Sequence, residues 1–330
     1  MKREFEIFAA AGIPHPCCVP GRRRAAQLDE SKGLSAARVR VTDGSAVDMV
    51  KLDDGPFLMG TDSEEGFPDD GEGPIRKIQL DAFYIDKFAV TNEQFGEFVT
   101  ATGYRTESER LGWSFVFQGH IPQERYQELV VATVPGASWW CRVNGADWKH
   151  PEGPDSSIDT RLQHPATHMS WNDAQAYCIW AGKRLPTEAE WEFAARGGFE
   201  QKTYPWGDEL TPENRHLCNI WQGIFPLVDS GEDGYAGPAP VNAFPANGYG
   251  LHNITGNTWE WCSDWFDSAS HLTATRSNPV GPPRGAAKVM KGGSYLCHAS
   301  YCNRYRVAAR TSNTPDSATT NIGFRCVRDI

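Results

Sequence analysis

Short apolar runs separated by turn-forming residues mark where the patterned part of the chain begins. Two such runs, 49–52 and 57–59, are separated by a stretch containing Asp-Gly, a pair favoured in tight hairpin turns. We expect these runs to form a β-hairpin at the start of a domain that covers 46–330. Residues 1–45 show no sustained periodicity, apart from a hint of a strand at 39–41, and predict a disordered N-terminal tail.

Three segments carry the spacing of short amphipathic helices. In the first, Thr91 and Gln94 form a capping box, apolar residues recur at helical spacing, and a glycine ends the pattern. The same signals recur twice further along the chain. We therefore expect helices within 91–103, 170–182 and 187–198.

The second half of the chain is rich in turn formers. Residues 201–250 are almost entirely Gly, Pro, Asn, Asp and aromatic residues, and a loop region of this length inside a domain usually has a function or binds ions. Residues 251–327 alternate short strand-like runs with Gly and Asn. With no repeat and no low-complexity linker that would split the chain, we expect much of the core to be held by turns and long loops.

Composition and charge narrow the function. The chain is 40% hydrophobic with 12 Trp, which is enough for a substantial core. Its formal net charge of -10 argues against a nucleic-acid partner, because such proteins neutralise phosphates with a basic surface. There is no apolar run of about 18 residues that would span a membrane, and no apolar stretch typical of a secretory signal. We expect a cytoplasmic protein with no membrane partner.

The nine cysteines are an odd number at irregular spacing, which is not typical of a secreted disulfide framework. At least one thiol must therefore be unpaired within the chain. Cys17, Cys18 and Cys141 suggest no role.

Cys297 and Cys302 form the most suggestive motif. They lie five residues apart, and the nearby His298, Arg304 and Arg306 are expected to favour thiolate, the form that attacks electrophiles and binds metals. Spacing alone leaves three interpretations open: a redox or metal site, a structural disulfide, or ordinary buried thiols. Two thiolates suit a soft ion such as Cu(I), whereas structural zinc needs four ligands.

The residues around this pair resemble the signature of the formylglycine-generating enzymes, of the prokaryotic cytoplasmic type. The resemblance is carried by Gly292-Gly293-Ser294-Tyr295, Cys297-His298, Ser300-Tyr301-Cys302, Arg304-Tyr305-Arg306, Ala308-Ala309-Arg310, Asn313-Thr314-Pro315-Asp316-Ser317 and Asn321-Ile322-Gly323-Phe324-Arg325-Cys326. Earlier motifs at 150–154, 182–191, 219–223 and 256–261 extend it to roughly 49–327. It implies a single α+β domain related to C-type lectins, with little regular secondary structure.

The resemblance implies a copper-dependent aerobic oxidase. Its substrate is an unfolded sulfatase polypeptide, in which the cysteine of a Cys-X-Pro-X-Arg motif becomes Cα-formylglycine. Cys297 and Cys302 would hold Cu(I), the substrate thiolate would join them, and dioxygen as cosubstrate would take a hydrogen from the substrate Cβ, after which a thioaldehyde hydrolyses and releases sulfide. The residues expected to line the cleft are Ser294, Trp259, His298 and Asn321. Without the family, Ser294 is more typical of a turn and Trp259 of a core.

Two structural calcium sites are also implied by the resemblance, and the chain supplies the hard oxygen ligands that calcium prefers. The first set is Asn219 and Asp233 with the carbonyls of Ile220 and Tyr235; the second is Asn253 and Glu260 with the carbonyls of Gly256 and Thr258. Taken alone, Asn and Asp near Gly are more typical of plain turns.

Several departures from the family bear on the cellular compartment. Secreted relatives carry a disulfide whose partners align with Ala195 and Val307, so both of its ends are missing, as suits a reducing cytoplasm. Cys178 and Cys326 align with the ends of another family disulfide, and they are expected either to pair or to lie in contact as thiols. Ala299 replaces a larger basic residue of some relatives, which bears on peptide specificity.

Two other functions share the scaffold. An iron-dependent sulfoxide synthase would add a helical domain with a His-rich motif, and nothing of that kind precedes Val47. A non-catalytic paralogue that only holds sulfatase peptides would lack the cysteine pair. We therefore favour the oxidase, acting as a monomer.

Overall fold

Capping boxes open the three predicted helices. The computed structural model describes residues 19–22, 46 and 48–330. In it, α1 (Asn92–Thr102), α4 (Trp171–Trp180) and α5 (Glu188–Arg196) each follow a Ser or Thr N-cap whose side chain accepts from the amide three residues on. Their predicted positions are confirmed. Two short helices that the pattern did not predict are α2 (Glu107–Leu111), which has a capping box of its own, and α3 (Tyr126–Leu129).

The predicted hairpin is wrong, although both of its strands exist. β1 (Met49–Leu52) pairs antiparallel with β4 (Phe83–Asp86), and β2 (Gly55–Met59) pairs with β3 (Arg76–Leu80). β14 (Val327–Asp329), at the end of the chain, completes the β1–β4 sheet. The turn residues between the two runs favoured pairing of one run with the other. Both strands instead pair with apolar strands that come later in the sequence, and a local pattern cannot show which strand will be the partner.

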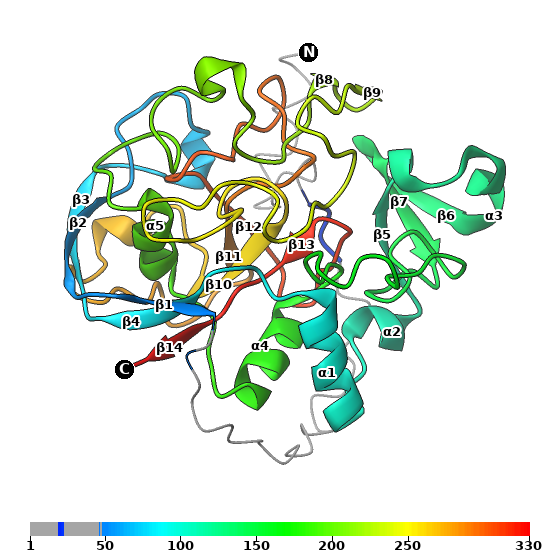
Figure 1. Cartoon of the computed structure of the whole chain (residues 1–330), viewed down its shortest axis with the longest axis horizontal. Helices are drawn as coiled ribbons and strands as arrows, with labels where there is room; N and C mark the ends of the chain where they lie inside the picture. The colour runs from blue at the N-terminus through cyan, green and yellow to red at the C-terminus, as the bar shows by residue number, and fades with distance from the viewer. Residues whose placement is uncertain (1–18, 23–45, 47) are drawn as a thin grey trace.

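The remaining strands form a central sheet and two smaller ones. The central sheet has the order β12–β11–β10–β13 and contains one parallel pair, β10 with β13. Its bounds, and those of the other strands, are β10 (Trp259–Trp265), β11 (Lys288–Lys291), β12 (Arg310–Asn313), β13 (Ile322–Gly323), β5 (Trp113–Phe117), β6 (Val130–Val134), β7 (Ala137–Asn144), β8 (Gly223–Ile224) and β9 (Val228–Asp229). The β5–β7–β6 sheet stands at one end of the molecule (Figure 1).

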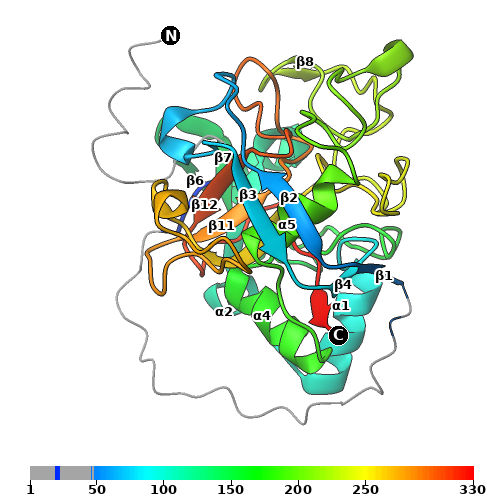
Figure 2. The same cartoon turned by 90° about the vertical axis from the view of Figure 1, so that its left-hand side faces the viewer.

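Helices cover the sheets on different sides. Figures 1 and 2 show α1 and α4 side by side, and the rings of Phe95 and Phe98 lie 6.0 and 5.7 Å from that of Tyr177. α5 packs between the β2–β3 ribbon and the central sheet. Apart from a 3₁₀ turn (Pro212–Asn214) and the short β8 and β9, residues 201–250 are loops, so the prediction of a loop-rich α+β fold is confirmed. Among the described residues, no helix has the length and apolarity needed to cross a membrane.

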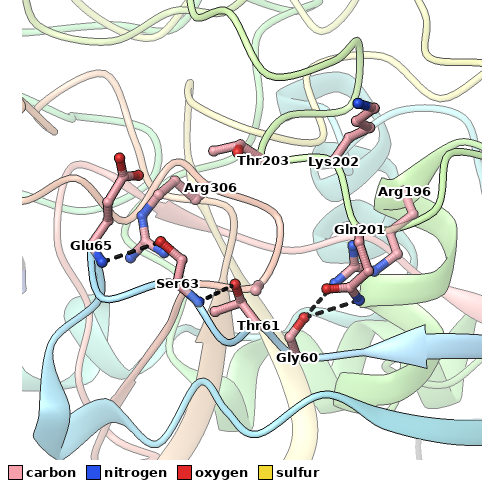
Figure 3. Close-up of a pocket in the computed structure, with 10 residues that line it drawn as sticks. Gly60, Thr61, Ser63, Glu65, Arg196, Gln201, Lys202, Thr203 and Arg306 are labelled. Atoms are coloured by element: carbon pink, nitrogen blue, oxygen red, sulfur yellow. Dashed lines mark hydrogen bonds between the residues drawn. The ribbon is translucent and has the colours of Figure 1, made fainter.

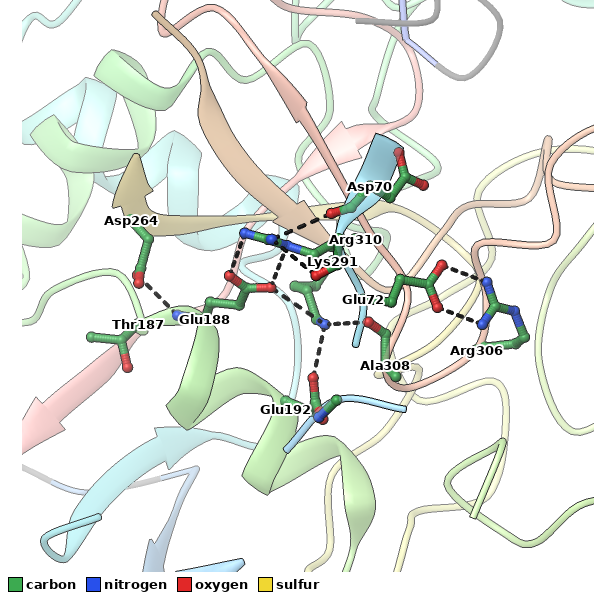
Figure 4. A network of polar contacts seen from close by, with 12 residues as sticks. Asp70, Glu72, Thr187, Glu188, Glu192, Asp264, Lys291, Arg306, Ala308 and Arg310 are labelled. Carbon is green, nitrogen blue, oxygen red and sulfur yellow. Dashed lines mark hydrogen bonds and ion pairs between the residues drawn. The ribbon is translucent and has the colours of Figure 1, made fainter. Parts of the chain in front are cut away.

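A buried network of charges ties α5 to the central sheet (Figure 4). Glu192 receives Nζ of Lys291 at 3.1 Å and Nη2 of Arg196 at 2.6 Å. Burial works to raise the pKa of Glu192, but these two cations outweigh it and lower the pKa to about 2. Arg310 on β12 donates to Glu188 at 2.8 Å. The network fixes β11, whose end leads into the cysteine motif.

Only four residues of the predicted tail are described, and they pack against the domain. Val19 is 1% exposed and Arg22 is 4% exposed. Cys17, Cys18, the possible strand at 39–41 and the rest of the predicted tail lie outside the described residues.

Candidate active site

Cys297 and Cys302 lie side by side inside the domain. Their Sγ atoms are 3.3 Å apart, and the residues are 2% and 0% exposed. No disulfide joins them, so the pair is a contact between two thiols. In the part of the chain that the structure describes, no three His, Cys, Asp or Glu side chains gather as metal ligands. A metal ion at this pair would therefore rely on two sulfur ligands from the described chain.

Successive tight turns bring the two sulfurs together. The amide of Cys297 donates to the carbonyl of Ser294 at 2.9 Å. The amides of Tyr301 and Cys302 both donate to the carbonyl of His298, at 3.0 and 2.7 Å. These turns fold the segment back on itself, so that both cysteines point to the same place.

A glycine allows the motif to approach its own continuation closely. Gly293 has a φ of 73°, in the left-handed region. A Cβ atom at this position would lie 3.0 Å from Cα of Tyr305. Only glycine permits both the conformation and the contact without strain.

Two buried ion pairs anchor the chain after Cys302. Nε of Arg304 lies 2.5 Å from Oδ2 of Asp70. The two terminal nitrogens of Arg306 each donate to one oxygen of Glu72 at 2.6 Å. The loop that carries both acids therefore clamps the far side of the cysteine motif.

Burial, rather than the charged neighbours, decides the protonation of Cys297. It is the largest influence on this residue and raises the pKa of its thiol, and the hydrogen bond with Cys302 raises it further. Arg304 and Arg306 pair with buried carboxylates, and Nη1 of Arg304 also donates to Sγ of Cys302 at 3.8 Å. The metal-free protein holds Cys297 protonated, so a metal ion must displace a proton to bind it.

A chain of hydrogen bonds joins Cys297 to two other predicted site residues. The amide of Ser294 donates to Sγ of Cys297 at 3.4 Å, and Nδ2 of Asn321 donates to Oγ of Ser294 at 2.9 Å. Thr319 donates its hydroxyl to Oδ1 of Asn321 at 2.5 Å, which fixes the orientation of the amide. Ser294 and Asn321 are both fully buried. The structure thus brings these residues into one polar cluster beside the thiols.

Trp259 and His298 occupy different positions relative to the pair. Trp259 is fully buried and belongs to the apolar cluster that contains both cysteines. Its indole Nε1 has no hydrogen-bond partner, and such a buried donor costs about 1–3 kcal/mol unless a bound molecule satisfies it. His298 is only partly buried, and its Nδ1 lies 2.8 Å from Oγ of the exposed Ser300. His298 therefore stands at the rim of the site.

The groups predicted to bind the first calcium ion converge. Asn219 is buried, and its Oδ1 has no partner. Nε2 of Gln222 contacts both the carbonyl oxygen of Ile220 and, at 2.9 Å, Oδ2 of Asp233. Two of the predicted calcium ligands, the carbonyl of Ile220 and the carboxylate of Asp233, therefore both contact the Gln222 side-chain nitrogen. The amide of Tyr235 donates to the other oxygen of Asp233 at 3.0 Å.

The second predicted calcium set has an unpartnered oxygen as well. Oδ1 of Asn253 has no partner, and the residue is 8% exposed. Glu260 is buried and receives both Nε and Nη2 of Arg325, at 2.7 and 2.8 Å, with Trp191 donating to Oε2 at 2.7 Å. Oε1 accepts one of these bonds and retains a lone pair for a cation. The remaining predicted ligands lie in the same loop, at the carbonyls of Gly256 and Thr258.

The two predicted calcium loops support each other and the cysteine motif. The amide of Asn257 donates to the carbonyl of Asn219 at 2.8 Å. From the first loop, the amide of Trp221 donates to the carbonyl of Cys297 at 3.0 Å, and the carbonyl of Asn257 in the second loop accepts from Tyr295, also at 3.0 Å. An ion that fixes either loop would therefore also fix the backbone of Cys297.

A second buried thiol pair lies elsewhere. Sγ of Cys178 and Sγ of Cys326 are 3.5 Å apart, and both cysteines are free. Of the two expected outcomes, the structure shows the contact and not the bond. Ala195 and Val307, which align with the disulfide of secreted relatives, are fully buried in an apolar cluster.

A small hollow opens on the far side of Arg306 (Figure 3). Residues 60–65 and 201–203 line it, together with Arg196, Arg306 and Ala308. The carbonyl of Gly60 accepts from Arg196 at 2.9 Å and from Gln201 at 3.3 Å at one wall. Neither cysteine of the pair lines this hollow, so it is not the thiol site.

Sequence reasoning missed two features of the site. The first is the clamp formed by Asp70 and Glu72, which lie more than two hundred residues before their arginines and give no local signal. The second is the buried segment 19–22. The sequence could have drawn attention to this segment, because residues 18–22 read Cys-Val-Pro-Gly-Arg and have the spacing of a Cys-X-Pro-X-Arg motif.

Fold and site together define a loop-rich α+β domain with a buried, reduced thiol pair. The solved structure of PvdO from Pseudomonas aeruginosa has this fold, with a TM-score of 0.63 over 86% of this chain and 94% of that one. At 23% identity, that likeness concerns the fold alone.

Sequence relatives identify the family. Residues 36–330 match the model of the sulfatase-modifying factor enzyme 1-like domain. The chain is 61% identical over 284 residues to the formylglycine-generating enzyme of Thermomonospora curvata, covering 85% of this chain and 93% of that protein. It is 54% identical over 281 residues to the formylglycine-generating enzyme of Bos taurus, covering 85% and 74%. The chain therefore belongs to the formylglycine-generating enzyme family.

Proposed function

We propose that this protein is a copper-dependent oxidase that converts the cysteine of a Cys-X-Pro-X-Arg motif in sulfatases to Cα-formylglycine, with dioxygen as the acceptor. The observation that carries the proposal is the pair of buried thiols at Cys297 and Cys302, in contact and not joined by a disulfide, in a member of this family.

The donor set at the pair fits Cu(I). Two sulfur ligands without a third protein ligand suit a soft ion of low coordination number better than zinc. Bound there, the copper would supply the redox chemistry that activates dioxygen. Cys297 and Cys302 would hold it as thiolates, and the raised pKa of Cys297 means that loading releases a proton.

The polar residues beside the pair orient the reactants. The bond from Asn321 to Ser294 fixes the serine hydroxyl near Sγ of Cys297, at 4.0 Å. The unpartnered indole N–H of Trp259 is available to a bound molecule such as oxygen, water or a substrate carbonyl. His298, at the rim, is placed to meet the incoming peptide.

Calcium at the two predicted sites would act structurally. The unpartnered oxygens of Asn219 and Asn253 are the kind of ligand that calcium takes. Because both loops bond to the backbone near Cys297, their ions would hold the thiol pair in place rather than take part in the reaction.

The partner and compartment follow from the same chemistry. A thiol pair that must stay reduced suits the cytoplasm, and none of the seven described cysteines is in a disulfide. The substrate is an extended sulfatase segment, met by a monomer whose catalytic domain spans 46–330.

The test is conversion of a synthetic peptide. Copper-loaded protein with oxygen and a reductant should turn a Cys-X-Pro-X-Arg peptide into its aldehyde, detected by mass spectrometry and by capture with a hydrazine. Cys302→Ala should abolish conversion, while Cys326→Ala, in the other thiol pair, should not. Conversion by Cys302→Ala at the rate of the parent would contradict the proposal.

A further inference from the structure

The buried segment Val19–Arg22 contacts the domain in the manner of a bound peptide. It belongs to no helix or strand. Figure 1 shows it as a short dark-blue stretch near β13 and β5. Val19 joins the apolar cluster that contains both thiol pairs, Cys297 with Cys302 and Cys178 with Cys326. A segment from the start of the chain therefore packs against the core that carries the thiols.

Side chains at the end of β12 and in the loop that follows it hold the backbone of this segment. Nδ2 of Asn313 donates to the carbonyls of Val19 and Pro20, at 3.4 and 3.3 Å. The amide of Arg22 donates to Oγ of Ser317 at 2.9 Å. The loop continues to Asn321, which bonds to Ser294 beside Cys297. Main-chain capture by side chains fits an extended ligand better than a strand of the fold.

The guanidinium of Arg22 occupies a formed pocket. Nη1 donates to the carbonyl of Asp316 at 2.9 Å, and Nη2 donates to Oγ of Ser108 and to the carbonyl of Trp113, each at 3.0 Å. The charge stacks over the ring of Trp113 at 4.8 Å. Burial lowers the pKa of Arg22, and the carboxylates of Glu107, Asp173 and Asp316 oppose this effect. The pocket thus offers arginine acceptors, an aromatic face and negative charge.

The sequence of the segment matches the proposed substrate motif. Cys18, Pro20 and Arg22 stand at the spacing of Cys-X-Pro-X-Arg, and the chain contains this spacing once. Cysteine and proline account for only 9 and 22 of 330 residues, so the match is not expected by chance. The Pro and Arg of the motif are also the residues that the structure shows docked.

We propose that Val19–Arg22 is a tethered ligand of the peptide-binding groove, so that the protein carries its own substrate-like segment and sulfatase peptides must displace it. This proposal rests on the proposed function only for the identity of the competing peptide. The groove, its arginine pocket and the occupant are all parts of this chain.

A tethered ligand weakens every competitor that uses the same groove. At an effective concentration of about 1 mM, a segment with its own Kd of about 0.1 mM would raise the apparent Kd of a free peptide about tenfold. Arg22→Ala removes the main anchor of the segment without touching the groove. It should therefore tighten binding of the free peptide about tenfold, and Arg22→Lys should tighten it less, because lysine keeps the charge but not the fork of donors.

The probe is a fluorescent peptide with the core Ser-Val-Pro-Gly-Arg, in which serine replaces the reactive cysteine. Its binding to the full-length, copper-free chain is followed by anisotropy. The control is Arg215→Ala, which removes an exposed arginine paired only with Glu213 and should leave the Kd unchanged. Adding Ser317→Ala to the Arg22→Ala variant removes one hydrogen bond to the peptide and should weaken binding about fivefold.

Opposite shifts at Arg22 and Ser317 would support the tethered ligand. If Arg22→Ala lowers Tm but leaves the peptide Kd unchanged, the segment is a structural part of the fold and the proposal is overturned. Absence of peptide binding in the parent and in all variants would overturn it too. Because this assay needs neither copper nor oxygen, failure of the oxidase reaction leaves its result intact.

Discussion

Two pairs of buried thiols in this protein have nearly the same separation, 3.3 Å for Cys297 with Cys302 and 3.5 Å for Cys178 with Cys326. Burial raises the pKa of Cys297 and of Cys326 alike. The pairs differ in their surroundings. The first adjoins the hydrogen-bonded Ser294, whereas the second joins α4 to the residue before β14, although both pairs belong to the same apolar cluster.

The difference teaches that the distance between two thiols does not identify a site. Both pairs could be read as unformed disulfides or as ordinary core contacts from their geometry. What distinguishes the first pair is the chain of hydrogen bonds beside it, from Asn321 through Ser294 to Cys297. The second pair therefore serves as an internal control for every experiment on the first.

The largest expected difference between substitutions in the two thiol pairs is in activity. Replacing Cys297 or Cys302 with Ala removes a proposed metal ligand. Mutation of a group that only supports a ligand already lowers metal affinity or activity about 10–100-fold, so the rate of conversion should fall by more than about a hundredfold. Cys178→Ala and Cys326→Ala should stay within a few-fold of the parent. The measurement is the rate of peptide aldehyde formation, and equal losses at both pairs would erase the distinction.

Arg304→Ala should produce the next largest effect, on stability. It leaves Asp70 buried without its partner, and breaking a buried pair costs about 3–5 kcal/mol. For a chain of this size, that loss should lower Tm by roughly 10 °C. Arg125→Ala, at a more exposed pair with Glu128, should cost less than about 1 kcal/mol. A melting curve of Arg304→Ala that matches the parent would show that the clamp does not hold the cysteine motif.

Asn321→Ala sharpens the comparison by altering only the surroundings of the first pair. Losing the bond to Ser294 should reduce copper affinity and activity about 10–100-fold, with a stability cost of about 1–3 kcal/mol from the groups left unpaired. Titration with Cu(I) measures the first effect and urea unfolding the second. An unchanged copper affinity would mean that the thiols alone define the site.

The smallest effect expected is a loss of stability at alkaline pH. Copper should change this loss at the first thiol pair and leave it unchanged at the second. The raised pKa of Cys297 and of Cys326 means that the folded state holds these protons more tightly than the unfolded state does. Their contribution to stability is complete below the unfolded thiol pKa of about 8.5 and is lost as pH rises above it. Metal-free protein should therefore lose stability as pH rises above about 8.5, measured by urea unfolding.

Copper should reverse this trend at the first pair alone, because binding releases protons and grows stronger as pH rises. The stability that Cu(I) adds should increase with pH in the parent and in Cys326→Ala. It should be absent in Cys302→Ala at every pH. The same increase in Cys302→Ala would place the metal elsewhere.

Local sequence signals predicted those parts of the fold that local physics decides. The N-caps at Thr91, Ser170 and Thr187 accept hydrogen bonds from amides three residues further on, so the starts of their helices could be predicted from the local sequence. The partner of β1 was not, because Phe83–Asp86 gives no signal of which strand it will meet. For the same reason, the sequence could indicate Cys297 and Cys302 but not Asp70, whose role depends on a contact across the whole chain.

The site illustrates a second limit, which is electrostatic. Arginines near a cysteine in sequence predict a thiolate, but Arg304 and Arg306 pair with acids that the sequence places far away, and the sulfur to which Arg304 donates is that of Cys302. Burial then decides the protonation of Cys297. The segment 19–22 is a different case. Its motif can be recognised in the sequence, but only the structure shows that Arg22 fills a pocket.

The most direct test is titration of the full-length protein with Cu(I) in competition with a chelator, using the two double variants Cys297→Ala/Cys302→Ala and Cys178→Ala/Cys326→Ala. The parent and the second variant should each bind one tight equivalent of Cu(I) with sulfur ligation seen by X-ray absorption, and the first variant should bind none. Tight binding that survives in the first variant and disappears in the second would contradict the assignment of Cys297 and Cys302 as the copper ligands.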